Sequence, residues 1–326
     1  MESPSQAPVA EASQAGQSPG VTVTRIDYHG WPESYLVANG IVEAVIVPAV
    51  GRVMQLRLAG GREGTFWENR ALDGQLHNAV SDQWMNFGGD KCWPAPQSAW
   101  GEQQDRDWPP PMAFDSRPME TAAGEFGLVL RSAVDEDYGV KVVRHVELEP
   151  DRPVMRIRTE FRKIHGDAVR VGVWTITQMR EPERISILLP AMSKFADGYI
   201  RLMESAPAQL KIDGRLLSFV RHPSAHVKIG TEASNLVWVG TNSLVRIEVE
   251  RRPGEYPAGG CVTEVYTNPG ALSYVELETL GPLTTLRPGD WIELTTVYTV
   301  LPRSTGDPEE EAQNVFRSVE LRAKPE

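Results

Sequence analysis

An alternation of apolar and polar residues with a period of two constrains the fold of this chain more than any other feature. The clearest example is residues 154–162. The alternating positions are Met155, Ile157, Thr159 and Phe161 on one side, and Arg156, Arg158, Glu160 and Arg162 on the other. Successive side chains of a strand point to opposite faces, so the pattern predicts an antiparallel strand with one buried and one solvated face.

Short turns separate further segments of this kind. Asn39-Gly40 lies between residues 35–38 and 41–47, and Asp213-Gly214 lies between residues 210–212 and 216–220. Both dipeptides favour two-residue hairpin turns, which require positive φ. Further strands are expected at 126–134, 140–148, 168–178, 235–239, 244–250, 261–266, 272–279 and 291–300. No long helical pattern interrupts them, so residues 21–302 are predicted to form one all-β domain, a large sandwich or barrel.

The two ends of the chain differ from this region. Residues 1–20 are rich in Ser, Gln, Pro and Ala without an apolar stripe, which predicts a disordered tail. They contain no signal peptide, so a cytoplasmic location is expected, or a periplasmic or secreted one if a signal was removed before residue 1. Residues 303–326 are expected to hold a short helix and a tail.

That C-terminal helix is predicted from its first turn and its apolar face. Asp307 can cap the helix, with Pro308 at the first position and three glutamates following it. The expected apolar face consists of Ala312, Val315, Phe316 and Val319. These residues recur at helical spacing, so the helix is expected to pack on the sandwich.

Charge and composition exclude several classes of partner. The 44 acidic residues outnumber the 33 lysines and arginines, for a net charge of −11, which disfavours nucleic acids and anionic membranes. No apolar run is long enough to cross a membrane. Cys92 and Cys261 could be two thiols or one disulfide. His222 and His226 have metal-ligand spacing only on a helix, which Pro223 opposes. No metal site or cofactor is therefore expected.

Residues 86–115 gather tryptophans and prolines in a stretch that reads as an irregular loop. Trp93, Trp100 and Trp108 are interspersed with hydrogen-bonding side chains, among them Asn86, Asp90, Lys91 and Gln97. Ring faces can stack on the C–H faces of sugars while amides and charged groups pair with hydroxyls, and prolines hold such a loop rigid. The alternative is a packed cap in which the tryptophans close the end of the sandwich.

Two predicted strands carry further candidate residues. Residues 272–283 (LSYVELETLGPL) place Tyr274, Glu276 and Glu278 on one face, with the two carboxylates about 7 Å apart. That arrangement suits acid–base chemistry, since each carboxylate raises the pKa of the other, although a solvated outer face is the alternative. The strand at 168–178 places Trp174 and Gln178 on one face, as core residues or as part of a ligand platform.

Three segments resemble proteins of the galactose mutarotase superfamily. Residues 38–61 (ANGIVEAVIVPAVGRVMQLRLAGG) are similar to its opening hairpin and Pro…Gly-Arg strand. Residues 275–300 are similar to its Leu-Glu-Thr strand, Leu-x-Pro-Gly-Asp/Glu turn and final strand. Residues 88–97 (GGDKCWPAPQ) resemble the Gly-Gly-x-x-x-Cys-Trp-Pro stretch of the hexose-6-phosphate mutarotase branch, with one residue fewer. With the following WPPPMAFD, this region looks most like an uncharacterised branch of mutarotase-like proteins.

The resemblance implies a fold and a set of site residues. The fold is a large antiparallel β-supersandwich whose concave sheet holds a sugar, with residues 86–115 over the cleft. The glutamate of Leu-Glu-Thr is the catalytic base in mutarotases, and Glu278 matches it. Glu276 is then expected to tune Glu278 or to orient a hydroxyl. Arg52, from the Gly-Arg pair, is a candidate sugar-binding residue.

The chain departs from the family pattern at two positions. The mutarotase histidine that protonates the ring oxygen is missing, since the corresponding region, VWTITQM, offers Trp174 and Gln178. Asp90 and Lys91 are the candidate acids, with Lys194 and Lys228 as further ones. Phe87 replaces the phosphate-binding arginine of the sugar-phosphate branch, so a phosphosugar is not implied.

Three functions are therefore compatible with the sequence. The first is an aldose 1-epimerase-like enzyme acting at the anomeric or an adjacent carbon of a sugar. The second is a carbohydrate-binding protein without turnover, in line with the missing histidine. The third is an oligosaccharide lyase or hydrolase. Because a fold hosts many activities, the choice depends on the site.

Overall fold

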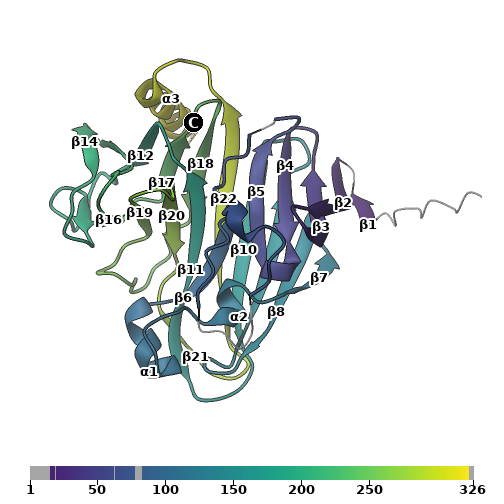
Figure 1. Cartoon of the computed structure of the whole chain (residues 1–326). Helices are drawn as coiled ribbons and strands as arrows, with labels where there is room; N and C mark the ends of the chain where they lie inside the picture. The colour runs from purple at the N-terminus through teal and green to yellow at the C-terminus, as the bar shows by residue number, and fades with distance from the viewer. Residues whose placement is uncertain (1–14, 19, 62, 78–82, 323–326) are drawn as a thin grey trace, which may run out of the picture.

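The alternating segments form the strands of two antiparallel β-sheets, which pack face to face (Figure 1). The computed structural model describes residues 15–18, 20–61, 63–77 and 83–322, excluding the side chains of 15–18 and 319–322. Buried residues from both sheets form the main hydrophobic core between them. The predicted all-β sandwich with a short C-terminal helix is thus confirmed.

The first sheet contains 12 strands in the described part of the chain, and it carries the candidate site. In spatial order its strands are β1 (Ala15–Ser18), β2 (Val21–Tyr28), β3 (Trp31–Ala38), β4 (Val42–Val47), β5 (Arg52–Leu58), β6 (Asp90–Ala95), β11 (Val169–Arg180), β20 (Tyr274–Leu280), β19 (Thr263–Thr267), β16 (Val227–Thr231) and β13 (Tyr199–Arg201). In addition, β21 (Thr284–Leu286) pairs with one end of β11.

The second sheet contains 10 strands and covers one face of the first. Its order is β14 (Ala208–Asp213), β15 (Leu216–Val220), β12 (Arg184–Leu188), β17 (Asn235–Val239), β18 (Ser243–Val249), β22 (Trp291–Pro302), β10 (Val154–Lys163), β9 (Val140–Leu148), β8 (Gly127–Asp135) and β7 (Glu120–Ala123). Except at 35–38, where β3 begins four residues earlier, the expected strands agree with these bounds to within about two residues, because their alternation is a local signal.

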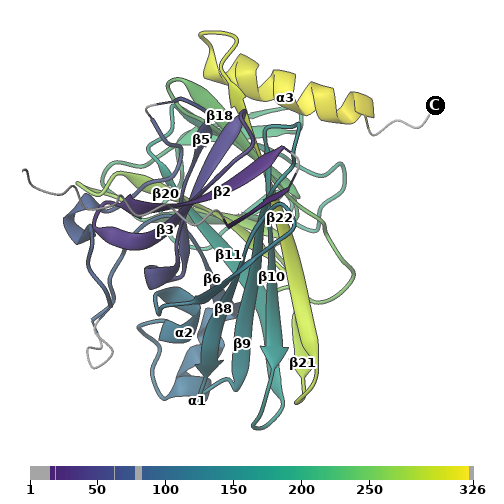
Figure 2. The ribbon, with the colours of Figure 1, turned by 90° about the vertical axis from the view of Figure 1, so that its right-hand side faces the viewer.

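Helices are few and lie at the two ends of the sandwich (Figure 2). The α-helices are α1 (Trp100–Gln104), α2 (Met112–Asp115) and α3 (Pro308–Arg322), and the 3₁₀ turns are η1 (Pro48–Val50), η2 (Arg70–Leu72) and η3 (Gln97–Ala99). None of the helices in the described residues has the length and apolar character needed to cross a membrane.

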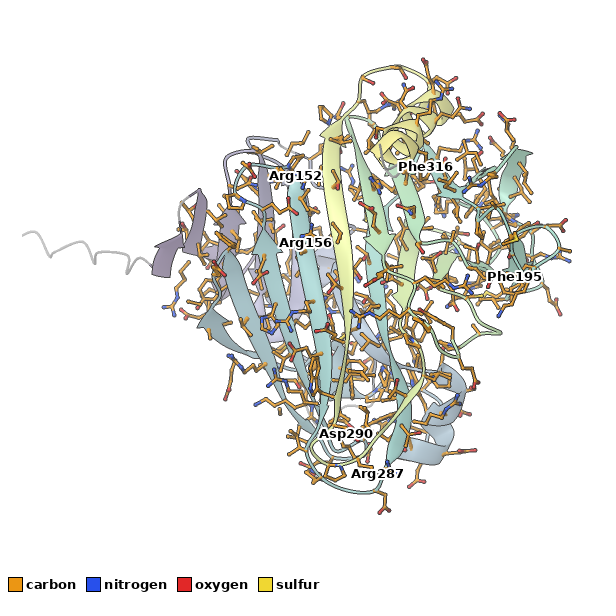
Figure 3. All side chains as sticks on the ribbon, turned by 180° about the vertical axis from the view of Figure 1, so that it is seen from behind. Arg152, Arg156, Phe195, Arg287, Asp290 and Phe316 are labelled. Carbon is orange, nitrogen blue, oxygen red and sulfur yellow. The ribbon has the colours of Figure 1, made fainter. Side chains whose placement is uncertain are left out.

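The predicted C-terminal helix is confirmed as α3. The carboxylate of Asp307 accepts hydrogen bonds from the backbone N–H groups of Glu309 (2.7 Å) and Glu310 (3.1 Å), which caps the helix. Its buried residues, which include Val315 and Phe316, pack on β17 and β18 (Figure 3). The side chain of Val319 lies outside the described residues.

Strand β10 shows the predicted alternation with one exception. Met155, Ile157 and Phe161 are buried, and Arg156 lies exposed on the outer face (Figure 3). Glu160 was expected on the solvated face, yet only 2% of its surface is exposed. Its carboxylate lies between the guanidinium groups of Arg158 and Arg162, which cover it.

The interpretation of residues 86–115 as an irregular loop was wrong. Residues Asp90–Ala95 form β6, a strand in the first sheet, and two short helices follow it. Because Pro94 lacks a backbone N–H, it does not fit a strand that is hydrogen-bonded to a neighbour on each side. However, β6 pairs with β5 only through Asp90 and Val53. Beyond that point β11 is the only strand among the described residues that pairs with β6, so β6 tolerates a proline.

Residues 1–20, expected as a disordered tail, are described only in part. Ala15–Ser18 forms β1 against β2, and residues 1–14 and 19 lie outside the described residues. Cys92 and Cys261 are both buried and both free, so the alternative of a disulfide between them is excluded.

Candidate functional site

Five adjacent strands of the first sheet, β6, β11, β20, β19 and β16, carry polar and aromatic side chains on the face turned away from the second sheet. Residues directly opposite each other in an antiparallel pair share a face. The register aligns Gln178 with Glu276, Glu276 with Tyr266, and Tyr266 with Lys228. We call this surface the open face. Its strand residues include Lys91, Trp93, Trp174, Gln178, Tyr274, Glu276, Glu278, Glu264, Tyr266 and Lys228.

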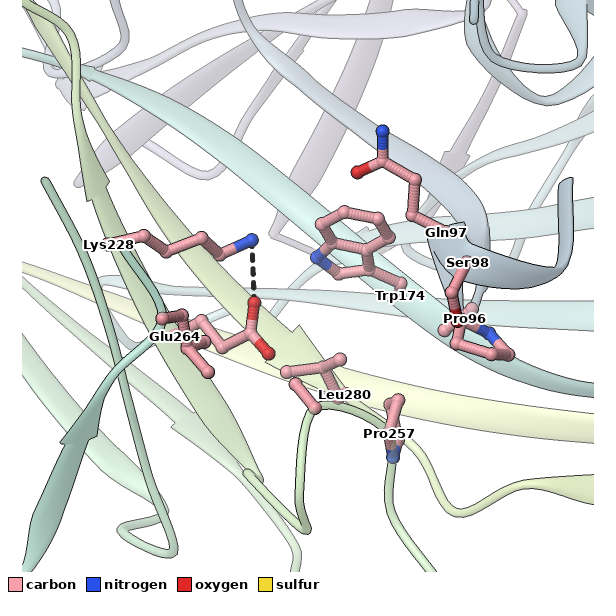
Figure 4. A pocket seen from close by; sticks show the side chains of 11 residues that line it. Pro96, Gln97, Ser98, Trp174, Lys228, Pro257, Glu264 and Leu280 are labelled. Carbon is pink, nitrogen blue, oxygen red and sulfur yellow. Dashed lines mark ion pairs between the residues drawn. The ribbon is translucent and has the colours of Figure 1, made fainter. Parts of the chain in front are cut away.

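A pocket of about 220 Å³ lies on the open face (Figure 4). Its lining residues are Ala95, Pro96, Gln97, Ser98, Trp174, Leu202, Lys228, Pro257, Ala258, Glu264 and Leu280. In Figure 4 the indole of Trp174 and the ammonium of Lys228 face each other across it. An aromatic wall with a few placed polar groups is the usual form of a small-ligand site.

Lys228 joins two carboxylates at the edge of this pocket. Its Nζ lies 2.6 Å from Glu264 Oε2 and 2.9 Å from Glu278 Oε2, and 4.7 Å from the ring centre of Trp174. Burial lowers the pKa of the ammonium, but Glu278 and Glu264 outweigh this and raise it above its ordinary value. Lys228 is therefore a cation. Two of its three N–H donors are used, which leaves one for a ligand.

Glu278 lies beneath Lys228 and Trp174 and has no exposed surface. Its Oε2 accepts hydrogen bonds from Trp174 Nε1 (2.7 Å) and Lys228 Nζ (2.9 Å), whereas its Oε1 has no partner. Burial raises the pKa of Glu278 to about 7; Lys228 opposes the shift and Glu264 adds to it. A carboxyl group that titrates near neutrality can both accept and release a proton at that pH.

Glu276 lies two residues away on the same face, beside Gln178 and Lys91. Its Oε1 accepts a hydrogen bond from Gln178 Nε2 (2.8 Å) and lies 3.6 Å from Lys91 Nζ. Burial raises the pKa of Glu276, while Lys91 counteracts the shift and Glu278 adds to it. The structure thus brings Glu276, Glu278 and Gln178 together, as the sequence predicted.

Lys91 is fully buried between aromatic rings. Its Nζ lies 4.5 Å from the ring centre of Trp93 and 5.4 Å from that of Trp84, and no described residue forms a hydrogen bond with it. Burial lowers the pKa of Lys91, an effect that Glu276 opposes and Arg52 reinforces. Lys91 is not one of the pocket-lining residues.

Asp90 requires a correction, because it lies on the opposite face of β6. Its carboxylate is fully buried between the sheets, where it pairs with Arg144 of β9 and accepts hydrogen bonds from Thr177 (2.7 Å) and Tyr298 (2.8 Å). Adjacent strand residues point in opposite directions, so Asp90 and Lys91 cannot both face the open side. Asp90 is a structural residue and cannot reach a ligand in the pocket.

The tryptophans of 86–115 also need correction. Trp100 is fully buried, and its indole N–H binds the carbonyl of Pro94 (2.8 Å). Trp93 is 5% exposed and donates to Asp115 (2.8 Å). Trp108 is 46% exposed, but its ring packs on Trp84 and Trp93 away from the pocket lining. For Trp93 and Trp100 the packed cap is the better description.

Some of the remaining predicted binding residues line the pocket, and others lie outside it. Gln97 and Trp174 line the pocket. Arg52 is fully buried and donates to the Gly88 carbonyl (2.7 Å) and to Asp115 (3.0 Å), so it braces the chain around β6. Asn86 is half-buried and lies outside the pocket lining.

The sequence analysis missed Glu264 and ranked Lys228 only among the further candidates. Glu264 lies opposite Glu278 in the β19–β20 ladder, and Lys228 reaches both carboxylates from β16. The alternation of Glu264 and Tyr266 in their strand is a visible signal. That alternation indicates a site only when β19 is known to lie beside β20. For Lys228 the sequence holds no local signal, because it is 50 residues away from Glu278.

Comparisons with solved structures identify the fold. A galactose mutarotase-like protein from Lactobacillus casei ATCC 334 aligns with a TM-score of 0.56 and 7% identity, over 82% of this chain and 100% of that chain. One from Clostridium acetobutylicum gives 0.52 and 11%, over 88% and 100%. The Slr1438 protein from Synechocystis sp. PCC 6803 gives 0.55 and 13%, over 85% and 99%.

Sequence comparisons add nothing to this, since no protein-family model and no curated protein matches the chain. At such low identities the structural likeness concerns the fold alone. The chain has the galactose mutarotase-like fold.

Proposed function

We propose that the protein binds a sugar in the pocket of the open face and interconverts its anomers, as an aldose 1-epimerase does. The observation that carries this proposal is the joined group Glu278–Lys228–Glu264 beneath the indole of Trp174. It combines a carboxyl whose pKa is raised to about 7 with a hydrogen-bonded cation at the edge of a pocket. The fold, which resembles galactose mutarotase-like proteins, adds support.

The proposed reaction transfers one proton from the anomeric hydroxyl to the ring oxygen. Glu278 accepts the proton of the hydroxyl on C1 while Lys228 donates a proton to the ring oxygen. The bond between C1 and the ring oxygen then breaks, and C1 becomes an aldehyde carbon. Rotation about the C1–C2 bond and the reverse transfers close the ring with the opposite configuration.

The 2.9 Å contact between Glu278 and Lys228 lets the two groups act as a relay. A lysine with a raised pKa is by itself a weak acid. Because protonated Glu278 can return its proton to Lys228 directly, the lysine need not stay deprotonated. This relay takes the place of the histidine that the sequence lacks. Trp174 is only 5% exposed, but it lines the pocket and supplies an apolar contact for the C–H groups of the sugar, and Gln97 can bind its hydroxyls.

A second candidate function is sugar binding without turnover. The observation that favours it is the complete burial of Glu278, whose Oε2 is already bonded to Trp174 and Lys228. In that case Glu278 serves to hold Lys228 in place, and Lys228, Glu264 and Gln97 make the polar contacts with the sugar. The two proposals share the same pocket.

Exchange NMR on a panel of free aldoses and uronic acids tests both functions. Acceleration of the exchange between α and β anomers by the wild-type protein supports the epimerase. Saturable binding with unchanged exchange supports the binding protein. Absence of both effects for every sugar of the panel contradicts the two proposals together.

A pair of tryptophan variants locates the binding. Trp174→Ala is expected to lose sugar binding, because Trp174 forms a wall of the pocket. Trp108→Ala is the matched control, since Trp108 is 46% exposed and lies outside the pocket. Thermal unfolding verifies that both variants are folded. Equal binding by the two variants would place the sugar elsewhere.

A further inference from the structure

A second group of aromatic rings crosses the open face beside the pocket, at some distance from Trp174. The ring centres of Trp67 and Tyr274 are 4.6 Å apart, those of Tyr274 and Tyr266 6.4 Å, and those of Tyr266 and His226 5.9 Å. Tyr274 is buried, Trp67 and Tyr266 are half-buried, and His226 is exposed. We call these four residues the second aromatic row.

The register shows that the row shares the open face with the acidic pair. Tyr274 is two residues before Glu276, and Tyr266 lies opposite Glu276. Phe66 bridges to Met179 and packs on Tyr298 in the core. The side chain of Trp67 therefore points to the open face. The backbone N–H of Trp67 donates a hydrogen bond to the backbone carbonyl of Gln178 (2.8 Å).

The distance between Trp174, on one wall of the pocket, and the second aromatic row exceeds one sugar ring. Tyr274 lies opposite Arg180, which is six residues from Trp174 along β11. Tyr266 is aligned across β20 with Gln178, which is four residues from Trp174. At the rise of a strand, these separations are about 20 Å and about 14 Å. A pyranose built from single bonds of about 1.5 Å measures roughly 7 Å with its hydroxyl oxygens.

The surface between the two aromatic groups is polar and has unused hydrogen-bonding capacity. Gln178 and Lys91 are fully buried, as is Glu278, and each has an atom without a partner, namely Gln178 Oε1, Lys91 Nζ and Glu278 Oε1. Buried polar atoms in proteins nearly always have a partner, so a hydroxyl-rich ligand along this line suits them.

The charges on the open face argue against an anionic ligand. Two lysines, Lys91 and Lys228, face three carboxylates, those of Glu264, Glu276 and Glu278. Arg180, which lies opposite Tyr274 and therefore shares this face, adds a third cation, so the fully ionised face is neutral. Such a surface has no excess of positive charge for a carboxylate or sulfate.

We infer that the open face binds a neutral oligosaccharide of three or four units, one against Trp174 in the pocket and one on the second aromatic row. This inference rests on the proposed function, because it extends a sugar site in the pocket. It makes the reducing-end unit the one that reaches Glu278 and Lys228, and the second aromatic row the part of the protein that selects chain length.

Titration calorimetry with neutral oligomers of one to four units tests the inference. The probes are α-1,4- and β-1,4-linked glucose and galactose oligomers. For the preferred linkage, we expect affinity to rise about 3- to 10-fold from one unit to three, as an added stacking contact predicts. Tyr266→Ala should lose this gain and keep the affinity for the single sugar. Tyr266→Phe, which retains the ring, should keep both.

The outcomes separate this inference from the proposed function. Equal affinity for all chain lengths, with binding of the single sugar still dependent on Trp174, would overturn the inference and leave the proposed function intact. Failure of every sugar to bind would contradict the proposed function itself. Tighter binding of a uronic acid trimer than of the neutral trimer would contradict the inference that the ligand is neutral.

Discussion

Glu278 owes its proposed reactivity to neighbours that control its proton. Burial favours the neutral carboxyl, and the adjacent Lys228 favours the carboxylate, so the pKa comes to about 7. Trp174 fixes the orientation of the group by donating to the same oxygen that accepts from Lys228. In the proposed mechanism, Oε1, which has no hydrogen-bond partner among the described residues, accepts the proton of a sugar hydroxyl.

Glu278→Gln is expected to abolish anomer exchange, by at least about 100-fold, because an amide cannot act as a general base. Sugar binding should persist, since the amide oxygen still accepts from Trp174 and Lys228. Exchange NMR and calorimetry on the same sample measure the two effects. Glu43→Gln, on β4 and paired with Arg57 outside the site, is the control and should behave as wild type. Full activity of Glu278→Gln would remove Glu278 from the mechanism.

The pH dependence of exchange follows from the same group. A base is active when deprotonated, so the rate should rise with pH, with a midpoint near 7 set by the pKa of Glu278, and level off above it. Exchange rates measured at constant ionic strength from pH 5.5 to 8.5 test this expectation. A rate that falls as pH rises across neutrality would assign Glu278 the role of an acid.

The pKa of Glu278 also affects stability in a defined direction. Since the pKa is raised on folding, the native state binds more protons than the unfolded state between about pH 4.5 and 7. The contribution of Glu278 to the free energy of unfolding is therefore largest at low pH and decreases as pH rises through this window.

Among the elements, β6 decides which candidate residues can reach the site. It is a strand because β11 pairs with it over six residues, from Asp90–Thr177 to Ala95–Gly172. Strand alternation then sends Lys91 and Trp93 to the open face, and Asp90 and Cys92 to the core. The proline-rich segment after β6 turns back over the sheet end, where Gln97 becomes part of the pocket wall.

Helix α3 depends on its apolar face for its attachment to the second sheet. Phe316 is 4% exposed and packs with Val237 and Val239. We expect Phe316→Ala to lower the free energy of unfolding by about 3 to 5 kcal/mol through lost burial and a cavity. The exposed neighbour Arg317→Ala should change it by less than about 0.5 kcal/mol. Chemical denaturation measures both; equal stabilities would mean that α3 is not held by this face.

Across the whole molecule, a buried polar group links the two sheets behind the site. Asp90 of β6 pairs with Arg144 of β9 and accepts from Tyr298 of β22. These residues are fully buried, so the charges compensate each other in a region of low polarity. The link fixes β6, and with it Lys91 and Trp93, relative to the second sheet.

Asp90→Asn is expected to destabilise the protein by about 3 to 5 kcal/mol, because it leaves the guanidinium of Arg144 buried without a carboxylate. Glu149→Gln, which affects ion pairs with the exposed Arg152 and Arg156, should cost less than about 1 kcal/mol. Denaturant unfolding measures both, and calorimetry should show that folded Asp90→Asn still binds sugar. Normal stability combined with lost turnover would restore Asp90 as a catalytic acid.

The sequence by itself determined most of the strands, the positions of the two hairpins and the capped helix α3. The two-residue turns expected at Asn39-Gly40 and Asp213-Gly214 were wrong, because only the two glycines have positive φ. Each correct prediction depends on interactions between residues close in the chain, such as alternation along β10 or the cap formed by Asp307. The same local rule placed Glu276 and Glu278 on one face. It failed for residues 86–115, where the prolines suggested a loop and the pairing of β6 with β11 overrode them.

Only the tertiary structure decided which residues meet at the site. The group of Glu278, Lys228 and Glu264 forms because β20, β19 and β16 are neighbours in one sheet, although Lys228 is 50 residues from Glu278 in sequence. The burial that raises the pKa of Glu278 likewise comes from residues distant in the chain. Strand pairing and burial are sums over non-local contacts, so a local pattern of residue types cannot contain them.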